Sequence, residues 1–306
     1  MNIKVVNNNE KSRVTIYEEG KQLAAATCFY KNTPKLKNKY VGTIGEIECD
    51  NIEALSKVIH ECIKILKEMK IEYVVAPMNQ TTWKKYRTLK STSNESMFLL
   101  ENVDPLEYNE VFLKSEFDLI HTYTSNKGKI SDAYNSEVLK LIADNLEKEK
   151  ITIRKVNKAD IYNELTKIYN VCIKSFCNNP FYTDISKEEY IKQYEKYIDM
   201  LDDDFILFAE KEKETIGFVF SIPNYNELKE KGKVTTLILK TIAVLPEYEE
   251  FGIGNIMLKK IEKIAKEKGY EDWIFAFMYD KNTSQKMAKR NKAEVIREYA
   301  LYGREI

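Results

Sequence analysis

The sequence predicts an α+β (α/β) protein of two domains, in which strands alternate with helices. The chain has 306 residues, and a single domain usually has about 100–200. Apolar residues recur at strand spacing and at helical spacing along both halves. The halves also resemble each other, because FDLIHTY (117–123) resembles AEVIREY (293–299) and the helix–strand pair 51–76 parallels 253–279. We interpret this similarity as a diverged duplication.

The first domain is expected to cover residues 1–125. Two apolar runs flank Glu18-Glu19-Gly20, which is a hairpin signal, and apolar residues at spacings of three and four predict a helix over 51–69. Residues 126–150 are polar and predict a linker with a helical segment near 135–149. Strands are expected at 14–17, 23–30, 40–48, 71–76 and 117–123, and a further helix near 105–115.

The second domain is expected to cover residues 151–306 and to repeat this order. Ile253, Ile256, Met257 and Ile261 begin an apolar helical stripe, which Gly269 is placed to end. Strands are expected at 151–156, 205–209, 215–222, 234–244, 273–279 and 294–302, and other helices at 159–176, 187–200 and 283–291.

Composition excludes several classes of function. Lys plus Arg equals Asp plus Glu, at 48 each, so the overall charge favours neither nucleic acid nor an anionic membrane as a partner. The N-terminus lacks the apolar core of a signal peptide, and no stretch approaches the length of a membrane span. Five cysteines without a CxxC pair, and only His60 and His121, predict a reduced, cytoplasmic protein with no metal site. We expect a monomer or homodimer.

The most informative segment runs from Thr241 to Gly254, with the sequence TIAVLPEYEEFGIG. A predicted strand leads into a loop, and two glycines one residue apart open a helix. Glycine lets a backbone approach a phosphate closely, and the first N–H groups of a helix have no partner within it. The helix N-terminus adds about half a positive charge. The segment therefore predicts a site for a pyrophosphate.

This segment resembles the pyrophosphate loop of the GNAT superfamily of N-acetyltransferases. The family pattern V-x-P-x-(Y/W)-(R/Q)-x-x-G-x-(G/A) fits Val244–Gly254 once one loop residue is allowed for, and Asn282 stands where the family has an Asn after the next strand. The resemblance implies two GNAT-like domains, each a mixed, mostly antiparallel central sheet flanked by helices. The first is expected to be degenerate, because CDNIEALS enters its helix without a glycine pair.

The resemblance also implies acetyl-CoA, or another acyl-CoA, as cosubstrate. Ile242, Ala243 and Val244 would lie along the pantetheine arm, and an N–H near Val244 could stabilise the tetrahedral oxyanion. Asn282 would hydrogen-bond the pantetheine or assist the thiol. The pyrophosphate would be held by the amides of Glu250, Phe251, Gly252, Ile253, Gly254 and Asn255.

The chain departs from the family pattern at catalytic positions. Glu249 replaces the usual Arg or Gln, and Glu250 follows it, so both carboxylates are expected to point away from a pyrophosphate. The family's general-acid Tyr falls near Lys289, which could stabilise a leaving thiolate or be a solvated lysine. The family's strand Glu falls among Leu237, Ile238 and Leu239, none of which can take a proton.

Acceptor-binding residues are expected in two insertions and in the first half. The insertions at 176–190 and 223–226 carry polar groups, and Glu189 could act as a base directly or through water. The alternative is that these groups are helix caps and solvated faces, with Ser186 and Glu189 forming a capping box. The candidates are Tyr182, Asp184, Tyr225, Asn226 and, at a cleft between the halves, Trp83 with Tyr86 and Arg87.

Three functions remain open at this stage. The first is N-acyl transfer from acyl-CoA to an amine of a small molecule or peptide, by direct attack in a ternary complex. The second is aminoacyl transfer from aminoacyl-tRNA, which the even charge balance disfavours. The third is a non-catalytic CoA-binding or interaction module with a degenerate active site.

Overall fold

The computed structural model describes residues 1–37, 39–130, 136–195 and 197–306. The first half contributes β1 (Asn2–Asn7), β2 (Lys11–Glu18), β3 (Lys21–Phe29), β4 (Lys35–Leu36), β5 (Lys39–Cys49), α1 (Ile52–Glu68), β6 (Tyr73–Ala76), β7 (Thr88–Thr92), α2 (Tyr108–Lys114) and β8 (Asp118–Lys129). Of these, β1, β4 and β7 were not predicted. The expected linker helix is α3 (Ser136–Lys148), and residues 131–135 of the predicted linker lie outside the described residues.

The second half repeats the strand–helix order. It comprises β9 (Ile151–Lys155), α4 (Ile161–Ser175), α5 (Lys187–Glu195), β10 (Ile206–Lys211), β11 (Glu214–Pro223), α6 (Glu227–Lys231), β12 (Thr236–Val244), the 3-10 turn η4 (Pro246–Phe251), α7 (Ile253–Glu267), β13 (Asp272–Tyr279), α8 (Ser284–Arg290) and β14 (Glu294–Glu305). The short 3-10 turns η1 (Lys158–Asp160), η2 (Ile198–Met200) and η3 (Asp203–Phe205) lie between these elements.

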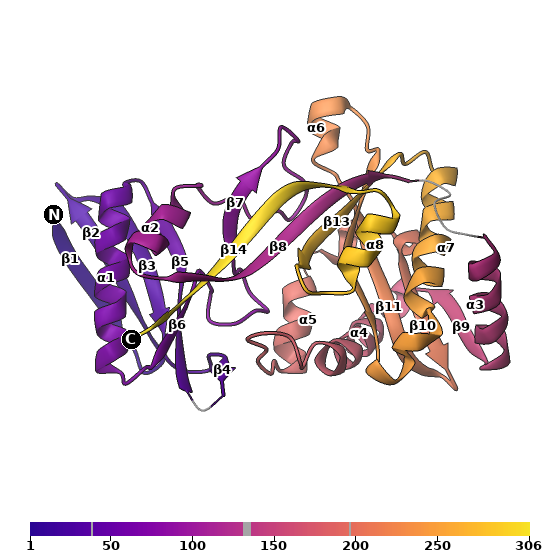
Figure 1. The fold of residues 1–306 in the computed structure, drawn as a ribbon, viewed down its shortest axis with the longest axis horizontal. Helices are drawn as coiled ribbons and strands as arrows, with labels where there is room; N and C mark the ends of the chain where they lie inside the picture. Colours follow the sequence, from indigo (N-terminus) through magenta and orange to yellow (C-terminus); the bar gives the residue numbers. More distant parts are fainter. Residues whose placement is uncertain (38, 131–135, 196) are drawn as a thin grey trace.

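All strands of the described chain join one 14-stranded sheet, in the order β1-β2-β3-β5-β6-β14-β8-β13-β12-β11-β10-β9, with β4 and β7 to the side. The pairs β5–β6 and β12–β13 are parallel, and the other described pairs are antiparallel. The predicted mixed, mostly antiparallel sheet flanked by helices is confirmed. The two halves lie side by side along it (Figure 1).

The two halves exchange their last strands. β14 comes from the end of the chain but pairs with β6 of the first half, where Tyr302 lies opposite Ala76. β8 comes from the first half but pairs with β13 of the second. The two exchanged strands run together between the halves, and the C-terminus lies beside the first half (Figure 1).

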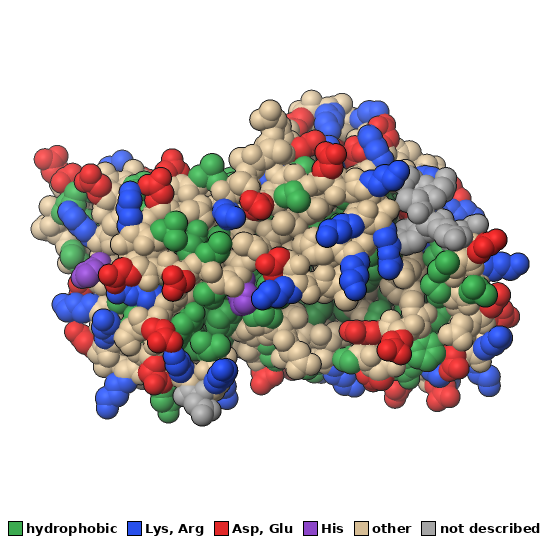
Figure 2. Space-filling view, in the orientation of Figure 1, with side chains coloured by type: hydrophobic (Ala, Val, Ile, Leu, Met, Phe, Trp, Pro, Cys, Tyr) green, Lys and Arg blue, Asp and Glu red, His purple; other side chains and the backbone are tan. Residues whose placement is uncertain are grey.

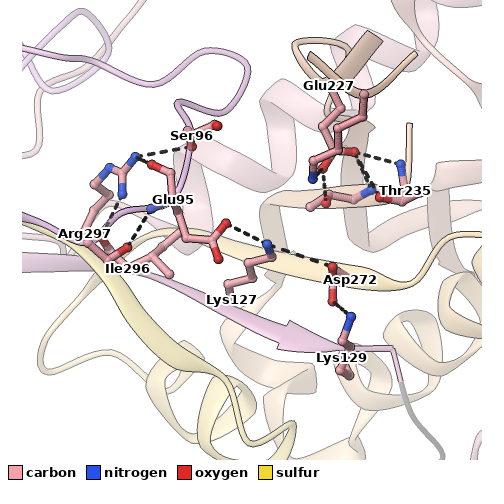
Figure 3. Close-up of polar contacts among 12 residues, drawn as sticks. Glu95, Ser96, Lys127, Lys129, Glu227, Thr235, Asp272, Ile296 and Arg297 are labelled. Atoms are coloured by element: carbon pink, nitrogen blue, oxygen red, sulfur yellow. Dashed lines mark hydrogen bonds and ion pairs between the residues drawn. The ribbon is translucent and has the colours of Figure 1, made fainter. Parts of the chain in front are cut away.

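Polar contacts reinforce this junction (Figure 3). Arg297 on β14 donates to the backbone carbonyls of Glu95 and Ser96, at 2.6 and 3.3 Å. On β8, Lys127 lies 2.7 Å from the Glu95 carboxylate and 4.0 Å from that of Asp272 on β13. The loop that carries Glu95 and Ser96 therefore contacts strands from both halves.

Candidate active site

The strands β12 and β13 separate in the middle of the sheet. They pair in parallel from Thr236 to Leu239, opposite Asp272 to Phe275, and the pairing ends there. On its other side β12 stays paired with β11 as far as Val244. An opening therefore forms between the second part of β12 and the end of β13.

A β-bulge lies in each strand at the start of this opening. Leu239 and Thr241 face the adjacent residues Ser221 and Phe220 of β11, so Lys240 is the extra residue of β12. In β13 the register with β8 shifts between Phe275 and Met278, and Phe277 has a φ of 55°. Bulges re-aim side chains and are enriched beside active sites. Both bulged residues line the same cavity.

This cavity has a volume of about 310 Å³ and is lined by both halves of the chain. Trp83 and Tyr86 come from the first half, and most of the remaining wall comes from the second. Trp83 donates a 2.7 Å hydrogen bond from Nε1 to the Thr183 carbonyl, and its ring meets those of Tyr182 and Tyr190 edge-on. Aromatic rings therefore form much of the wall, where they favour an apolar ligand body.

Two cations, Arg87 and Lys240, line the cavity. The Arg87 guanidinium carbon lies over the rings of Tyr86, Tyr123 and Phe277, at 4.3, 4.6 and 4.6 Å from their centroids. The Lys240 ammonium lies over the same Phe277 ring, at 4.2 Å. Burial, and then the charge of Arg87, lower the pKa of Lys240 from 10.5 to about 7.

The other titratable groups of the cavity wall are phenols and one thiol. Burial raises the pKa of Tyr182 and Tyr194 to about 12, and it raises the pKa of Tyr190 and of Tyr279 as well. These phenols are therefore protonated at neutral pH. Among the described residues, no Asp, Glu or His lines the cavity.

The N-terminus of α7 carries the predicted pyrophosphate loop. Gly252 is its N-cap, with the left-handed φ of 72° that favours glycine, and no side chain caps the helix. The first turn of α7 contains no acidic residue, and Glu249 and Glu250 are exposed. Arg290 of α8 reaches Asn255 at 3.4 Å, and Lys and Arg side chains gather over α8 (Figure 2). These groups fit a pyrophosphate.

The linker helix α3 packs beside this turn. A Cβ atom at Gly252 would lie 3.0 Å from the Ile142 side chain, whereas one at Gly254 would meet Ile242 and Met287 at 3.3 and 3.4 Å. Glycine at 252 therefore meets two requirements, the positive φ and the close approach of α3. The side chain of Ile253 is fully buried, so only its backbone could contact a ligand.

Six of the predicted site residues meet at the cavity, namely Ile242, Asn282, Tyr182, Trp83, Tyr86 and Arg87. Next to Ile242, Ala243 is buried in the core. The carbonyl of Val244 accepts a 3.0 Å hydrogen bond from the Ser175 hydroxyl, so that oxygen already has a partner. The other cavity-lining residues come mainly from α4, α5, β8, β10, β11, β12 and β13.

The remaining predicted residues lie outside the cavity wall. Asp184, Glu189 and Lys289 are exposed; the Glu189 amide donates to the Ser186 hydroxyl, as in a capping box, and its carboxylate lies 3.5 Å from Lys84. Tyr225 and Asn226 bond instead to the backbone carbonyls of Met200 and Met97.

Asn226 is followed by a buried structural carboxylate. Glu227 accepts hydrogen bonds from the amides of Thr235 and Thr236 and from the Thr236 hydroxyl (Figure 3). Burial raises its pKa, but the hydrogen bonds from Thr236 and Lys231 outweigh this and lower it to about 2. The 225–236 segment is therefore built around this ion and fixes the start of β12.

The corresponding opening in the first half is closed by its own chain. β5 and β6 pair from Val41 to Thr43, and the Met78 amide then donates to the Ile44 carbonyl at 2.7 Å. The Glu46 amide donates to the Asn79 side chain at 2.6 Å. A Cβ atom at Gly45 would lie 2.4 Å from the Met78 carbonyl oxygen, so this opening has no room for a pantetheine arm.

Sequence comparison assigns a family to the second half. Residues 162–291, which contain the separated strands, the glycine pair and α8, match the model of the acetyltransferase (GNAT) family. These residues form a GNAT-family domain. The predicted resemblance is thereby confirmed. No curated protein matches the sequence.

Solved structures extend the GNAT fold to both halves. A GCN5-related N-acetyltransferase from Sphaerobacter thermophilus has 10% identity and a TM-score of 0.53, over 97% of this chain and 80% of its own. A tandem GNAT protein from the clavulanic acid biosynthesis pathway has 8% identity and a TM-score of 0.53, over 96% and 82%. The tandem arrangement of the fold is confirmed.

A third structure belongs to a much longer protein. It is a fungal multi-domain GH3 β-N-acetylglucosaminidase with a GCN5-related glucosamine N-acetyltransferase region, at 10% identity and a TM-score of 0.57. The match covers 96% of this chain but only 33% of that protein. At such low identity these three similarities establish the GNAT fold of the chain.

Sequence analysis missed two residues in the GNAT-family domain, Lys240 and Arg290. A single charge within the apolar run LILKTIAV was the available signal for Lys240. Arg290 was missed because its helix position does not reveal that it reaches Asn255 on α7. None of the helices in the described part of the chain has the length and apolar character of a membrane span. Within the same residues, no three His, Cys, Asp or Glu side chains gather as metal ligands.

Proposed function

We propose that the chain is an N-acyltransferase that moves acetyl, or a related acyl group, from acyl-CoA to an amine of a small molecule or peptide. The observation that carries this proposal is the opening between β12 and β13. Ile242 beside this opening lines the cavity and also lies next to Gly254 in the uncapped first turn of α7. In this proposal residues 151–306 hold the acyl-CoA, and residues 1–125 contribute Trp83, Tyr86 and Arg87 to the cavity wall.

The residues of the opening would each have a defined task. Amides of Gly252 to Gly254, with Arg290, would bind the pyrophosphate, whereas the Asn255 amide already donates to the Gly252 carbonyl at 3.0 Å. Backbone groups of β12 beyond Leu239 have no partner on β13, so they are free to pair with a pantetheine arm. Bound acyl-CoA would supply the thioester. The acceptor nitrogen attacks the thioester carbon, the C–N bond forms and the C–S bond breaks. The proton that the nitrogen loses balances the one that the departing thiolate takes up.

The buried aromatic wall would favour this reaction in two ways. It excludes water that would otherwise compete with the amine for the thioester. It would also hold the acceptor near the inner end of the opening between β12 and β13. The two reactants would then be positioned before they react and would not depend on a bimolecular encounter. All five cysteines are free thiols, which supports a reducing, cytoplasmic location.

A second candidate function is CoA binding without catalysis. It is favoured by the absence of Asp, Glu and His from the described part of the cavity wall, since these are common general bases. An amine library assayed with acetyl-CoA and a thiol-reactive dye, beside calorimetric titration of CoA, separates the two. Turnover of an amine supports the enzyme. CoA binding without turnover of any amine supports the second candidate, and no CoA binding contradicts both.

A further inference from the structure

The two cations of the cavity have no counter-charge among the described residues. Neither Arg87 nor Lys240 makes an ion pair there. The Arg87 side chain donates one hydrogen bond, from Nη1 to the Tyr86 hydroxyl at 3.1 Å, and its Nε has no partner. Arg87 is only 9% exposed. A guanidinium has five N–H donors, so most of its binding capacity is unused.

The acidic residues that share a second cavity with Arg87 are already paired with other cations. A second cavity, which Arg87 also borders, is lined by Glu46, Glu48 and Asp104. Their carboxylates lie 3.6, 2.7 and 2.6 Å from Lys11, Arg13 and Lys85. Glu101 lies 2.8 Å from Arg297. The positive charge of the first cavity is therefore not balanced by its acidic surroundings.

Two neighbouring cations in an aromatic cavity are unfavourable unless an anion joins them. The lowered pKa of Lys240 agrees with this, because burial and the charge of Arg87 both disfavour its ammonium form. Contact with the surrounding rings uses none of the N–H donors of Arg87, which leaves the donors that do not reach Tyr86 for a carboxylate or phosphate. Both bulged residues, Lys240 and Phe277, line this cavity.

We propose that the acceptor amine carries an anionic group, a carboxylate or a phosphate, which Arg87 and Lys240 bind in this cavity. This inference rests on the proposed N-acyl transfer. The aromatic wall would take the apolar body of the acceptor, and its amine would face the end of the opening between β12 and β13. A molecule with only positive charges, such as a polyamine, is disfavoured by the same two cations.

The first test compares acceptors that differ only in the anionic group. Phenylalanine is assayed against phenylalanine amide and phenethylamine, and glucosamine 6-phosphate against glucosamine, with acetyl-CoA and thiol release as readout. We expect kcat/KM to be at least about tenfold higher for the anionic member of one set. The phenylalanine set tests recognition of a carboxylate, and the glucosamine pair tests recognition of a phosphate. Equal or better use of the neutral members would overturn the inference and leave the proposed function intact.

Variants connect this preference to the two cations. Lys240→Met and Arg87→Lys are expected to lower the preference for the anionic acceptor about tenfold, mainly by raising KM. Lys229→Met, which removes an exposed charge on α6, is the matched control and should keep the preference. A preference unchanged in Lys240→Met would contradict the inference. An equal loss of kcat for charged and neutral amines would also contradict it, because it would make Lys240 a base.

A binding measurement decides the inference even without turnover. Phenylacetate and inorganic phosphate carry the anionic group but no reacting amine. Calorimetry on the intact chain, repeated on Gly252→Asp to remove phosphate binding at the N-terminus of α7, reports the anion site. We expect one of them to bind, and Lys240→Met to weaken it about tenfold. If neither binds at about millimolar concentration, the anion site does not exist. If an anion binds but no amine is acylated, the proposed function fails and the site remains.

Discussion

At the scale of single residues, the site depends on groups whose surroundings change their chemistry. Lys240 is an ordinary lysine in the sequence, but as the bulged residue of β12 it lies in the wall of an aromatic cavity that Arg87 also lines. Gly252 is one of several glycines with positive φ, but it also lies against Ile142 and opens α7. The chemistry of both residues is set by neighbours that are distant in the chain.

Gly252→Asp is expected to weaken CoA binding at least about tenfold, because its carboxylate would lie beside the pyrophosphate. The measurement is calorimetric titration of CoA. Gly232→Asp is the matched control, since Gly232 has a φ of 68° and nothing within 4 Å of an added Cβ. It should cost similar backbone strain, about 1–2 kcal/mol, without changing CoA affinity. An unchanged CoA affinity in folded Gly252→Asp would place the phosphates elsewhere.

Lys240→Met is expected to stabilise the protein at low pH. The pKa of Lys240 is about 7 in the folded chain, against 10.5 for an unperturbed lysine, so the unfolded chain binds more protons between these pH values. Wild-type stability therefore rises across this window, and the cost of the buried ammonium is largest at and below about pH 7. The free energy of unfolding of Lys240→Met should exceed that of wild type by about 2 kcal/mol or more at about pH 6, and the difference should shrink towards about pH 10.

Urea unfolding of wild type and Lys240→Met across this pH range checks the prediction. Lys229→Met serves as control for the loss of an exposed charge and should show no such trend. A stability difference that stays constant with pH would show that Lys240 titrates normally in the folded chain.

At the scale of elements, the two halves use the same pair of parallel strands differently. In the second half β12 and β13 separate beyond Leu239, and the opening remains. In the first half Met78 and Asn79 fill the place between β5 and β6 and satisfy backbone groups there. A filled opening binds nothing, so the duplicated fold provides one opening where the strand pattern suggests two.

One CoA is therefore expected to bind per intact chain. The measurement is the stoichiometry of a calorimetric titration of the full-length protein with CoA. Gly252→Asp should remove all the binding detected, because it alters the only opening that the described residues leave unfilled. Two sites per chain, or binding that persists unchanged in Gly252→Asp, would show that the first half also takes CoA.

At the scale of the whole molecule, exchange of β8 and β14 makes the halves interdependent. β14 separates β6 from β8, and its residues Tyr299, Ala300 and Leu301 are fully buried. A fragment of residues 1–130 would lack β14, and residues 136–306 would lack β8. Each fragment would then expose the edge of β6 or β13, with unpaired backbone groups and apolar surface.

Neither fragment is expected to fold cooperatively alone, whereas a mixture should assemble into a one-to-one complex that binds CoA. Denaturant unfolding and gel filtration of each fragment, and of the mixture, provide the measurement. The intact chain is the reference for the slope of the transition, which scales with the surface exposed on unfolding. A monomeric fragment with a sharp transition of its own would contradict this interdependence. The proposed division at residues 125 and 151 would then describe independent domains.

The sequence by itself determined the local elements and the family. Apolar periodicity predicted α1, α7 and most strands, because their core faces repeat at helical or strand spacing. The glycine pair at 252 and 254 indicated the GNAT domain. The periodic signal failed for β1, whose residues are all exposed, and for β7, which is short and largely polar. Such strands form because a neighbouring edge is available, and the sequence pattern does not report that.

Only the tertiary structure decided which residues share the site. Arg87 and Lys240 are far apart in the chain, and one bulge and one turn bring both over Phe277. The sequence did not reveal the exchange of β8 and β14 either, because the segments FDLIHTY and AEVIREY are similar enough to fit the sheet of either half. Local spacing sets the conformation of a segment, whereas the partner of a strand edge and the surroundings of a charge depend on long-range packing.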